Sequence, residues 1–446
     1  MLLFSELGES ISIDVNQKDA YEEVASTKSL LDGRSVEDVI NGKRMTDKKL
    51  RWTLKFLTLL CHVLYPASKP HALCMTACRV VKLSVEHGFC SDSAEGLQIY
   101  GFGVWNFQNS VEECLKWNRG AKRLVESLGA KHMIPRVTMN LNTASYWNEP
   151  LQAKIESLKE THRELVMVGD KDNLLLNGVH FVRRSLLCGR NLLTAERECA
   201  ALLNEIHQLR QMNGLLPMIS NHLSILKLIG SNYDSEQQLN EPLFHLLGNS
   251  EIKCQDGLLQ HALSNGLTGF VQHCYFDRLL HAFWSKNYEE AAHYAEKYSE
   301  CHQFRHFPDM FQTFYLGITA FHLARLEDSK TREWLDVGKK ALSKYQTWVK
   351  YSDWNWENKM LLLEAESHVC EGELEMAKSK FHASIDSAQR HRFIHEEGLA
   401  SELLGMLYEE NGNKEEAMQQ YAHARSCYQK WGAFALADRL YKSTAN

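Results

Sequence analysis

The feature that most constrains this chain is a set of six positions that recurs after 40 residues near the C-terminal end. Each set has the same order: a small residue, a ring-bearing residue, a glycine, an alanine, an aromatic residue and a second small residue. The matched pairs are Ala365 and Gly405, His368 and Tyr408, Gly372 and Gly412, Ala377 and Ala417, Phe381 and Tyr421, and Ser384 and Ala424. Because all six recur in one register, the sequence predicts a repeated structural unit between residues 357 and 443.

The order of residue types indicates what that unit is. Small side chains let two antiparallel helices approach closely, aromatic side chains fill the space between them, and a glycine suits the turn. This order is close to the tetratricopeptide pattern, in which helix–turn–helix units bury their apolar faces against their neighbours. Helical signals recur every roughly 35 to 45 residues along the rest of the chain, without convincing strand alternation. We therefore expect an all-α superhelical solenoid of tetratricopeptide-like helix-turn-helix repeats.

The regularity of the apolar pattern divides the chain into three parts. Residues 1–46 are expected to form an N-terminal lead-in, 47–263 an irregular helical-repeat region, and 264–446 the tetratricopeptide-like repeat region. Apolar residues at three-to-four spacing predict the individual helices. Helices ahead of the two repeats are expected over residues 18–32, 47–65, 71–88, 91–107, 109–128, 132–147, 150–169, 171–187, 192–212, 215–229, 288–303, 309–325, 331–349 and 355–370.

Local signals predict several helix ends. Asp47 is expected to cap the helix that follows it, and Ser35 with Asp38 resembles a capping arrangement. The stretch Trp284–Ala291 resembles a tetratricopeptide turn between two helices. Residues 231–241 form the most polar stretch and are the best candidate for a loop.

Composition excludes several classes of function. A formal net charge of −6 and an isoelectric point near 6.4 provide no basic surface for nucleic acid, so no nucleic-acid partner is expected. No run of roughly 18 apolar residues occurs, so we expect no membrane span, and the N-terminus lacks the basic segment of a signal peptide. The 12 cysteines are scattered without a C-x-x-C pair, which is typical of reduced core thiols in a cytoplasmic protein.

A search for catalytic motifs finds none. The phosphate-binding pattern G-x-x-x-x-G-K-[ST] is absent, and Gly101-Phe-Gly103 lies among helical stretches rather than after a strand. Nucleophile-elbow and kinase signatures are absent as well. We therefore expect no catalytic residue, no cofactor and no metal ligand, and a chain that is not itself an enzyme.

Two H-x-x-x-H pairs leave one enzymatic alternative open. They are His302 with His306 and His391 with His395. On a helix, such spacing turns both rings to one face, where they can bind a metal ion. The motif H-E-x-x-H needs Glu directly after the first histidine, but Arg392 stands there. The alternative is a metal-dependent enzyme, such as a hydrolase, whose site is assembled from distant residues and uses His391 and His395.

Four tryptophans precede the two repeats and allow two interpretations. They are Trp334, Trp348, Trp354 and Trp356. In the first interpretation, their rings pack between successive helices. In the second, they line a concave groove that grips a partner peptide, with charged rims that set specificity.

Five stretches of the chain carry a resemblance to a known family. They are LFSELGE (3–9), VKLSVEHG (81–88), WNEPL (147–151), VGD (168–170) and AHARSCYQKWGA (422–433). In order and spacing they are similar to the helical-repeat region of large hybrid signalling proteins. Those proteins combine a serine/threonine kinase-like domain, an AAA-type predicted ATPase module, a tetratricopeptide-like region, a GAF domain and a histidine kinase. The last stretch is the most specific and resembles the closing helix of that region.

The resemblance covers nearly the whole chain and implies a role without catalysis. The kinase, nucleotide-binding and histidine-kinase motifs of the family are missing, so none of its catalytic residues is carried over. What remains resembles a scaffold or regulatory module of intracellular signal transduction that holds protein partners. The resemblance implies kinase or ATPase signalling components as those partners, and leaves open whether this chain acts alone or belongs to a larger signalling protein.

Overall fold

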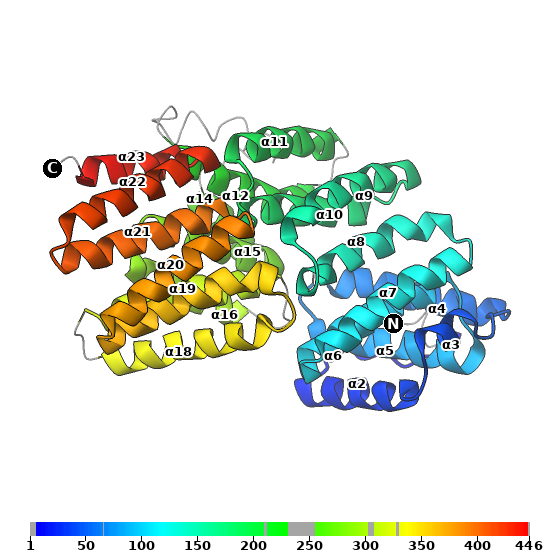
Figure 1. The fold of residues 1–446 in the computed structure, drawn as a ribbon. Coiled ribbons are helices and arrows are strands. Elements are labelled where there is room, and N and C mark those ends of the chain that lie inside the picture. Colours follow the sequence, from blue (N-terminus) through cyan, green and yellow to red (C-terminus); the bar gives the residue numbers. More distant parts are fainter. Residues whose placement is uncertain are drawn as a thin grey trace.

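The computed structural model describes residues 6–65, 67–208, 212–230, 255–301, 307–326 and 330–444. Within these ranges the secondary structure is helical and no strand occurs, apart from a single parallel bridge between Arg44 and Phe89. The fold is an all-α superhelical solenoid of tetratricopeptide-like helix–turn–helix repeats (Figure 1). The predicted loop 231–241 and the pair His302 and His306 lie outside the described residues.

The first part of the array extends to residue 230. Its α-helices are α2 (Gln17–Leu31), α3 (Val36–Ile40), α4 (Lys48–Leu64), α5 (Pro70–His87), α6 (Ser91–Gln108), α7 (Val111–Ser127), α8 (Ile134–Ala144), α9 (Lys154–Val168), α10 (Lys171–Leu187), α11 (Leu192–Gln208) and α12 (Met212–Ile229). Three 3-10 turns, η1 (Lys131–Met133), η2 (Ser145–Trp147) and η3 (Leu151–Ala153), accompany α8 and precede α9. The predicted helices of this part are confirmed, with corrections at their ends. The helix expected over 192–212 ends at Gln208, and Met212 already begins α12. The helix expected over 150–169 begins at Lys154, after the turn η3.

The helix expected over residues 132–147 is wrong in its length. α8 ends at Ala144, and the chain continues as the 3-10 turn η2 before it reaches Pro150. The backbone N–H groups of Asn148 and Glu149 both donate to the Ser145 carbonyl, and Pro150 has no N–H with which to continue a helical ladder. The break also turns the rings of Tyr146 and Trp147 into the core, where both are buried.

Side chains ahead of two helices form the expected caps. Asp47 accepts a hydrogen bond from the Leu50 backbone N–H, and Ser35 and Asp38 form both bonds of a capping box. These bonds satisfy backbone groups that a helix leaves without partners in its first turn. The predicted starts of α3 and α4 are therefore confirmed.

The second part of the array contains the helix pairs that carry the repeat. Its helices are α14 (Gln255–Ser264), α15 (Thr268–Trp284), α16 (Tyr288–Cys301), α17 (Pro308–Ala324), α18 (Thr331–Trp348), α19 (Asp353–Glu371), α20 (Leu374–Arg390), α21 (Ile394–Glu410), α22 (Lys414–Trp431) and α23 (Phe434–Thr444). α19 packs against α20, and α21 packs against α22. The turn predicted after Trp284 is confirmed, because α16 begins at Tyr288.

The solenoid returns on itself. α23, at the C-terminal end, packs against α12 from the first part (Figure 1). The turn between α10 and α11 also meets the end of α22, where the Asn191 side chain donates a hydrogen bond to the Lys430 carbonyl at 3.0 Å. Segments more than 200 residues apart in sequence are thereby joined. We call these contacts, together with those between residues 146–151 and α19, the closure joint.

Two large apolar cores hold the helices together. One contains residues between Val24 and Val137, and the other extends from Trp105 in α6 to Leu440 in α23. The division of the chain after residues 46 and 263 stays a prediction, because packing alone does not assign domain limits. Among the described helices, none combines the length and the apolar character needed to cross a bilayer.

Candidate functional site

The repeat positions predicted from the sequence lie in the interfaces and turns of two helix pairs. Gly372 and Gly412 adopt left-handed backbone conformations after α19 and α21, with φ of 76° and 79°. Gly405 packs directly on the ring of Tyr421, since a Cβ atom there would lie 2.7 Å from that ring. His368 and Tyr408 are half-buried. The buried positions are Ala365, Ala377, Phe381, Ser384, Ala417 and Ala424.

The closure joint is held by a polar side chain that satisfies backbone groups. Asn355, near the start of α19, accepts a hydrogen bond from the Leu151 backbone N–H at 3.1 Å. It also donates to the carbonyls of Tyr146 and Glu149, at 2.9 and 2.8 Å. Because Asn355 is fully buried, its loss would leave three backbone groups without their partner.

The tryptophans before the repeats are part of the packing of this joint. Trp356 is fully buried, and its ring centroid lies 6.2 Å from that of Trp147. Trp348 contacts both rings, at 6.1 Å from Trp147 and 6.4 Å from Trp356. Trp334 and Trp354 are half-buried against the same core. The packing interpretation is confirmed, and Trp356 is too deeply buried to line a groove, whereas for the half-buried Trp334, Trp348 and Trp354 the groove interpretation stays a prediction.

His391 and His395 do not share a helix face. His391 follows the last residue of α20, the chain turns at Arg392 with φ of 62°, and His395 lies in the first turn of α21. The ring of His395 packs on Trp431, with centroids 5.0 Å apart. Burial lowers the pKa of His395 well below its ordinary value. The assumption that one helix presents both rings to a metal ion is therefore wrong for this pair.

A buried ion pair joins α19 to α21 beside the joint. Lys359 Nζ lies 2.7 Å from Glu396 Oε2, and the two side chains are 0% and 1% exposed. The ammonium also donates to the Asn355 carbonyl at 2.9 Å, and Asn358 donates to the same Glu396 oxygen at 2.5 Å. Burial lowers the pKa of Lys359 and raises the pKa of Glu396, although each partner opposes the other's shift. No sequence signal links these residues, because they are 37 positions apart.

A cavity of about 200 Å³ lies where α10, α12 and α15 meet α21, α22 and α23. Its walls include the indole rings of Trp284 and Trp431 and the imidazole of His395. The ring nitrogens of His395 and the indole nitrogen of Trp431 have no hydrogen-bond partner of good geometry among the described residues. A volume of this order suits a single small ring compound. It is too small for a peptide segment, so it is not a groove for a protein partner.

The exposed face of α4 is a different kind of surface. Trp52, Leu59 and Val63 are 54%, 45% and 62% exposed, and Phe56 is half-buried between them. Spacings of four, three and four residues place all four side chains within about 60° around the helix axis. We call these four residues the α4 stripe. The opposite face of α4 is already covered, because it packs against α5 and α6.

Basic residues border the α4 stripe on both sides. Lys48, Lys49, Arg51 and Lys55 are all exposed, and α4 contains no acidic residue. The Lys55 ammonium lies 5.1 Å from the centre of the Trp52 ring. An apolar line with positive borders is the pattern of a helix that packs on a partner helix.

The sequence predicts α4 but not which of its faces remains exposed. Apolar residues occur all round this helix. One set with three-to-four spacing contains Leu50, Leu54 and Leu57, and the α4 stripe, which starts at Trp52, forms a second set with the same kind of spacing. The available signal was the 4-3-4 spacing between Trp52 and Val63, which is that of a seam between two helices. Only the structure shows that the first set meets the core, whereas in the second set Phe56 packs partly against the core and Trp52, Leu59 and Val63 stay exposed.

Comparisons with known proteins place the chain in no family. No family model matches it, and none of the curated proteins compared with it is similar. Among solved structures it is similar to a circular tandem repeat protein with novel repeat topology and enhanced subunit contact surfaces. The two share 14% sequence identity over 98% of this chain and 97% of that chain, with a TM-score of 0.18. At these values, no ligand, partner or activity is transferred from that protein.

Proposed function

We propose that this chain is a non-catalytic scaffold or regulatory helical-repeat module of intracellular signal transduction, located in the cytoplasm, that binds protein partners. The observation that carries this proposal is the α4 stripe, an exposed apolar line on a helix whose other face is already packed. Large exposed apolar patches with polar borders mark sites of protein interaction. The free thiols of the described residues are compatible with a reducing compartment.

The chemistry of the α4 stripe defines the partner surface. The stripe extends from Trp52 to Val63, about 16 Å along the axis of α4, which is the length of three helical turns. A partner helix of similar length with apolar residues at three-to-four spacing would fit beside it. Acidic residues on both borders of that helix would face the lysines and the arginine of α4. The proposed partner element is therefore an amphipathic helix with acidic borders.

The same charges disfavour a second copy of this chain as the occupant. Two copies of α4 packed face to face would bring eight basic side chains together, four from each helix, and like charges across an interface suppress pairing. The proposed partner is therefore another protein. The similarity of stretches such as residues 422–433 to hybrid signalling proteins supports kinase or ATPase components as that protein.

The test is a pull-down from native lysate that compares three versions of the purified chain. The stripe variant carries Trp52→Ser and Val63→Ser, and the control carries Met167→Ser, which changes an apolar side chain that is 79% exposed on α9. We expect wild type and control to recover the same kinase or ATPase component, and the stripe variant to lose it. Equal recovery by all three versions, or no reproducible partner, would contradict the proposal.

The enzymatic alternative loses the pair of ligands on which it rested. His391 follows the end of α20 and His395 lies in α21, where it packs on the ring of Trp431. Non-catalytic binding is therefore the function that the geometry supports best.

A further inference from the structure

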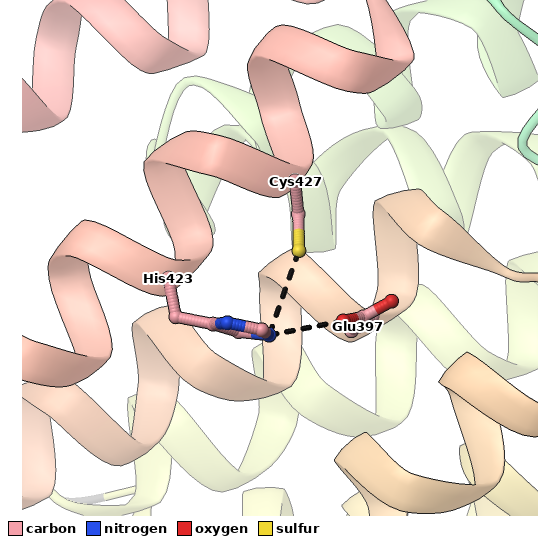
Figure 2. Close-up of side chains that lie close together, drawn as sticks. All are labelled: Glu397, His423 and Cys427. Carbon is pink, nitrogen blue, oxygen red and sulfur yellow. Dashed lines mark hydrogen bonds and ion pairs between the residues drawn. The ribbon is translucent and has the colours of Figure 1, made fainter.

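Three potential metal ligands converge between α21 and α22. His423 and Cys427 are one helical turn apart on α22, and Glu397 faces them from α21 (Figure 2). His423 Nε2 lies 2.9 Å from Glu397 Oε1 and 3.7 Å from Cys427 Sγ. The three ligand atoms all lie within 4.8 Å of one another.

Both contacts are made by the same nitrogen of His423. In a nucleophilic site, a histidine uses one ring nitrogen for the nucleophile and the other for the carboxylate that orients it. Here Glu397 and Cys427 both approach Nε2 (Figure 2), so the group cannot pass a proton along such a relay. Convergence on one point is instead the geometry of a ligand set around an ion.

The distances are close to those of a tetrahedral zinc site. Bonds of about 2.0–2.1 Å to nitrogen, 2.0–2.2 Å to oxygen and 2.3 Å to sulfur give ligand separations of about 3.3–3.6 Å. The 3.7 Å separation of His423 and Cys427 lies about 0.1 Å above this range, and that of His423 and Glu397 needs to open by about 0.5 Å.

Burial provides the second independent observation. The side chain of Glu397 is 7% exposed, whereas that of His423 is 44% exposed. Within the described residues the ion-pair partner of Glu397 is His423, a group that is charged only when protonated. A buried carboxylate therefore lacks a permanent cation, and the site opens to solvent on the side of His423, where a water molecule can complete four-coordination.

A second grouping of possible metal ligands, also among the described residues, differs in its burial and in its partners. His368, Glu371 and Glu373 lie at the turn between α19 and α20, with both carboxylates exposed. Glu371 is already paired with Lys339 at 2.8 Å. Exposed carboxylates with a lysine partner are satisfied by solvent and by that lysine, so this grouping carries no proposal.

We propose that Glu397, His423 and Cys427 bind a divalent transition-metal ion of the zinc class, which ties α21 to α22 in the second repeat. Binding replaces the thiol proton: the Cys427 S–H bond is lost, a sulfur–metal bond forms, and the proton passes to solvent. His423 binds through Nε2 as a neutral imidazole. This site is separate from the α4 stripe and does not depend on the proposed function.

The test uses the full chain after removal of metal ions with a chelator and dialysis. Cobalt(II) is added first, because a cysteine ligand produces a sulfur-to-cobalt charge-transfer band in the near ultraviolet, and zinc is then used to displace it. We expect one equivalent of cobalt with this band and tighter binding of zinc. Absence of the band, or a band that does not saturate near one equivalent, would overturn the proposal.

Three variants assign the band to this site. Cys427→Ser should abolish the band, and the control Cys370→Ser, which changes a half-buried thiol on α19, should keep it. His423→Gln changes a half-exposed ring and should therefore leave the fold intact. It tests whether the metal binds at this site even if Cys427→Ser fails to fold. His423→Gln should weaken zinc binding at least about 100-fold. Mutation of a residue that only hydrogen-bonds to a metal ligand already lowers metal affinity by about 10- to 100-fold. Unchanged affinity in His423→Gln, or an unchanged band in Cys427→Ser, would contradict the assignment.

Discussion

Removal of Glu396 should destabilise the repeats, because it would leave the Lys359 ammonium buried without its carboxylate. The structure places the two side chains 2.7 Å apart at 0% and 1% exposure. After Glu396→Leu, the ammonium would keep the Asn355 carbonyl, at 2.9 Å, and the faces of aromatic rings, of which Phe393 is 3.9 Å away, but no anionic partner. Breaking one partner out of a buried pair typically costs about 3–5 kcal/mol.

Deprotonation of Lys359 sets an upper limit to that cost. The lysine can lose its proton instead of remaining charged, and from an ordinary pKa of 10.5 this costs about 5 kcal/mol at pH 7. We therefore expect a loss of about 3–5 kcal/mol for Glu396→Leu at pH 7. The difference in unfolding free energy between wild type and Glu396→Leu should become smaller as pH rises towards 10.5. In this pH range Lys359 of the unfolded variant also loses the proton that Lys359 of the folded variant has already lost.

The assay is urea unfolding followed by far-ultraviolet circular dichroism. The double variant Lys359→Met with Glu396→Leu removes both charges at similar volume and should lie within about 2 kcal/mol of wild type. As a control, Lys339→Met with Glu371→Leu removes an exposed pair at 2.8 Å and should change stability by less than about 1 kcal/mol. The reasoning is refuted if the double variant loses as much stability as Glu396→Leu alone, or if Glu396→Leu costs less than about 1 kcal/mol.

Three further predictions concern the closure joint and its surroundings. Gly230→Ala should lower the unfolding midpoint in urea, because Gly230 has φ of 73° and a Cβ atom there would lie 2.5 Å from the Cβ of Ala435. Trp356→Ala should destabilise the chain by about 3–5 kcal/mol in the same assay, since it empties a fully buried site beside Trp147. Burial lowers the pKa of His322 to about 4, so the unfolded imidazole takes up a proton more readily than the folded one. Wild type should therefore lose stability relative to His322→Gln as pH falls from 6.5 towards 4, and parallel pH profiles would contradict this.

The elements that the sequence predicts well are those decided by neighbouring residues. The caps at Ser35 and Asp47 and the turn at Gly372 depend on bonds and backbone angles within a few residues. The recurrence of six positions predicts the repeat itself, because stacking of helix pairs requires small and aromatic side chains at fixed places. These features predict the helical solenoid.

The closure joint could not be predicted in this way. Asn355 meets the backbone of Leu151 across 204 residues, and contacts at such separation leave no local period in a sequence. The pair His391 and His395 could not be placed from the sequence either. Their spacing suggests a single helix, but the chain turns between them.

The candidate sites could be predicted from the sequence only in part. The spacing from Trp52 to Val63 is visible in the sequence, but its exposure follows from which face of α4 packs against α5 and α6. The i, i+4 pair of His423 and Cys427 is visible as well, whereas Glu397 joins it only because α21 packs against α22. In each case the sequence supplies the residue types, and packing decides whether they form a site.

Site-specific photo-crosslinking tests the central claim most directly. A photoreactive phenylalanine derivative placed at Leu59, in the middle of the α4 stripe, should cross-link to another protein in native lysate. The account predicts that the cross-linked peptide belongs to an amphipathic helix with acidic borders in a kinase or ATPase component, and that cross-linking falls as salt concentration rises. The same derivative at Met167 should not give this product. Cross-links only to this chain, or to basic or non-helical segments, would contradict the account.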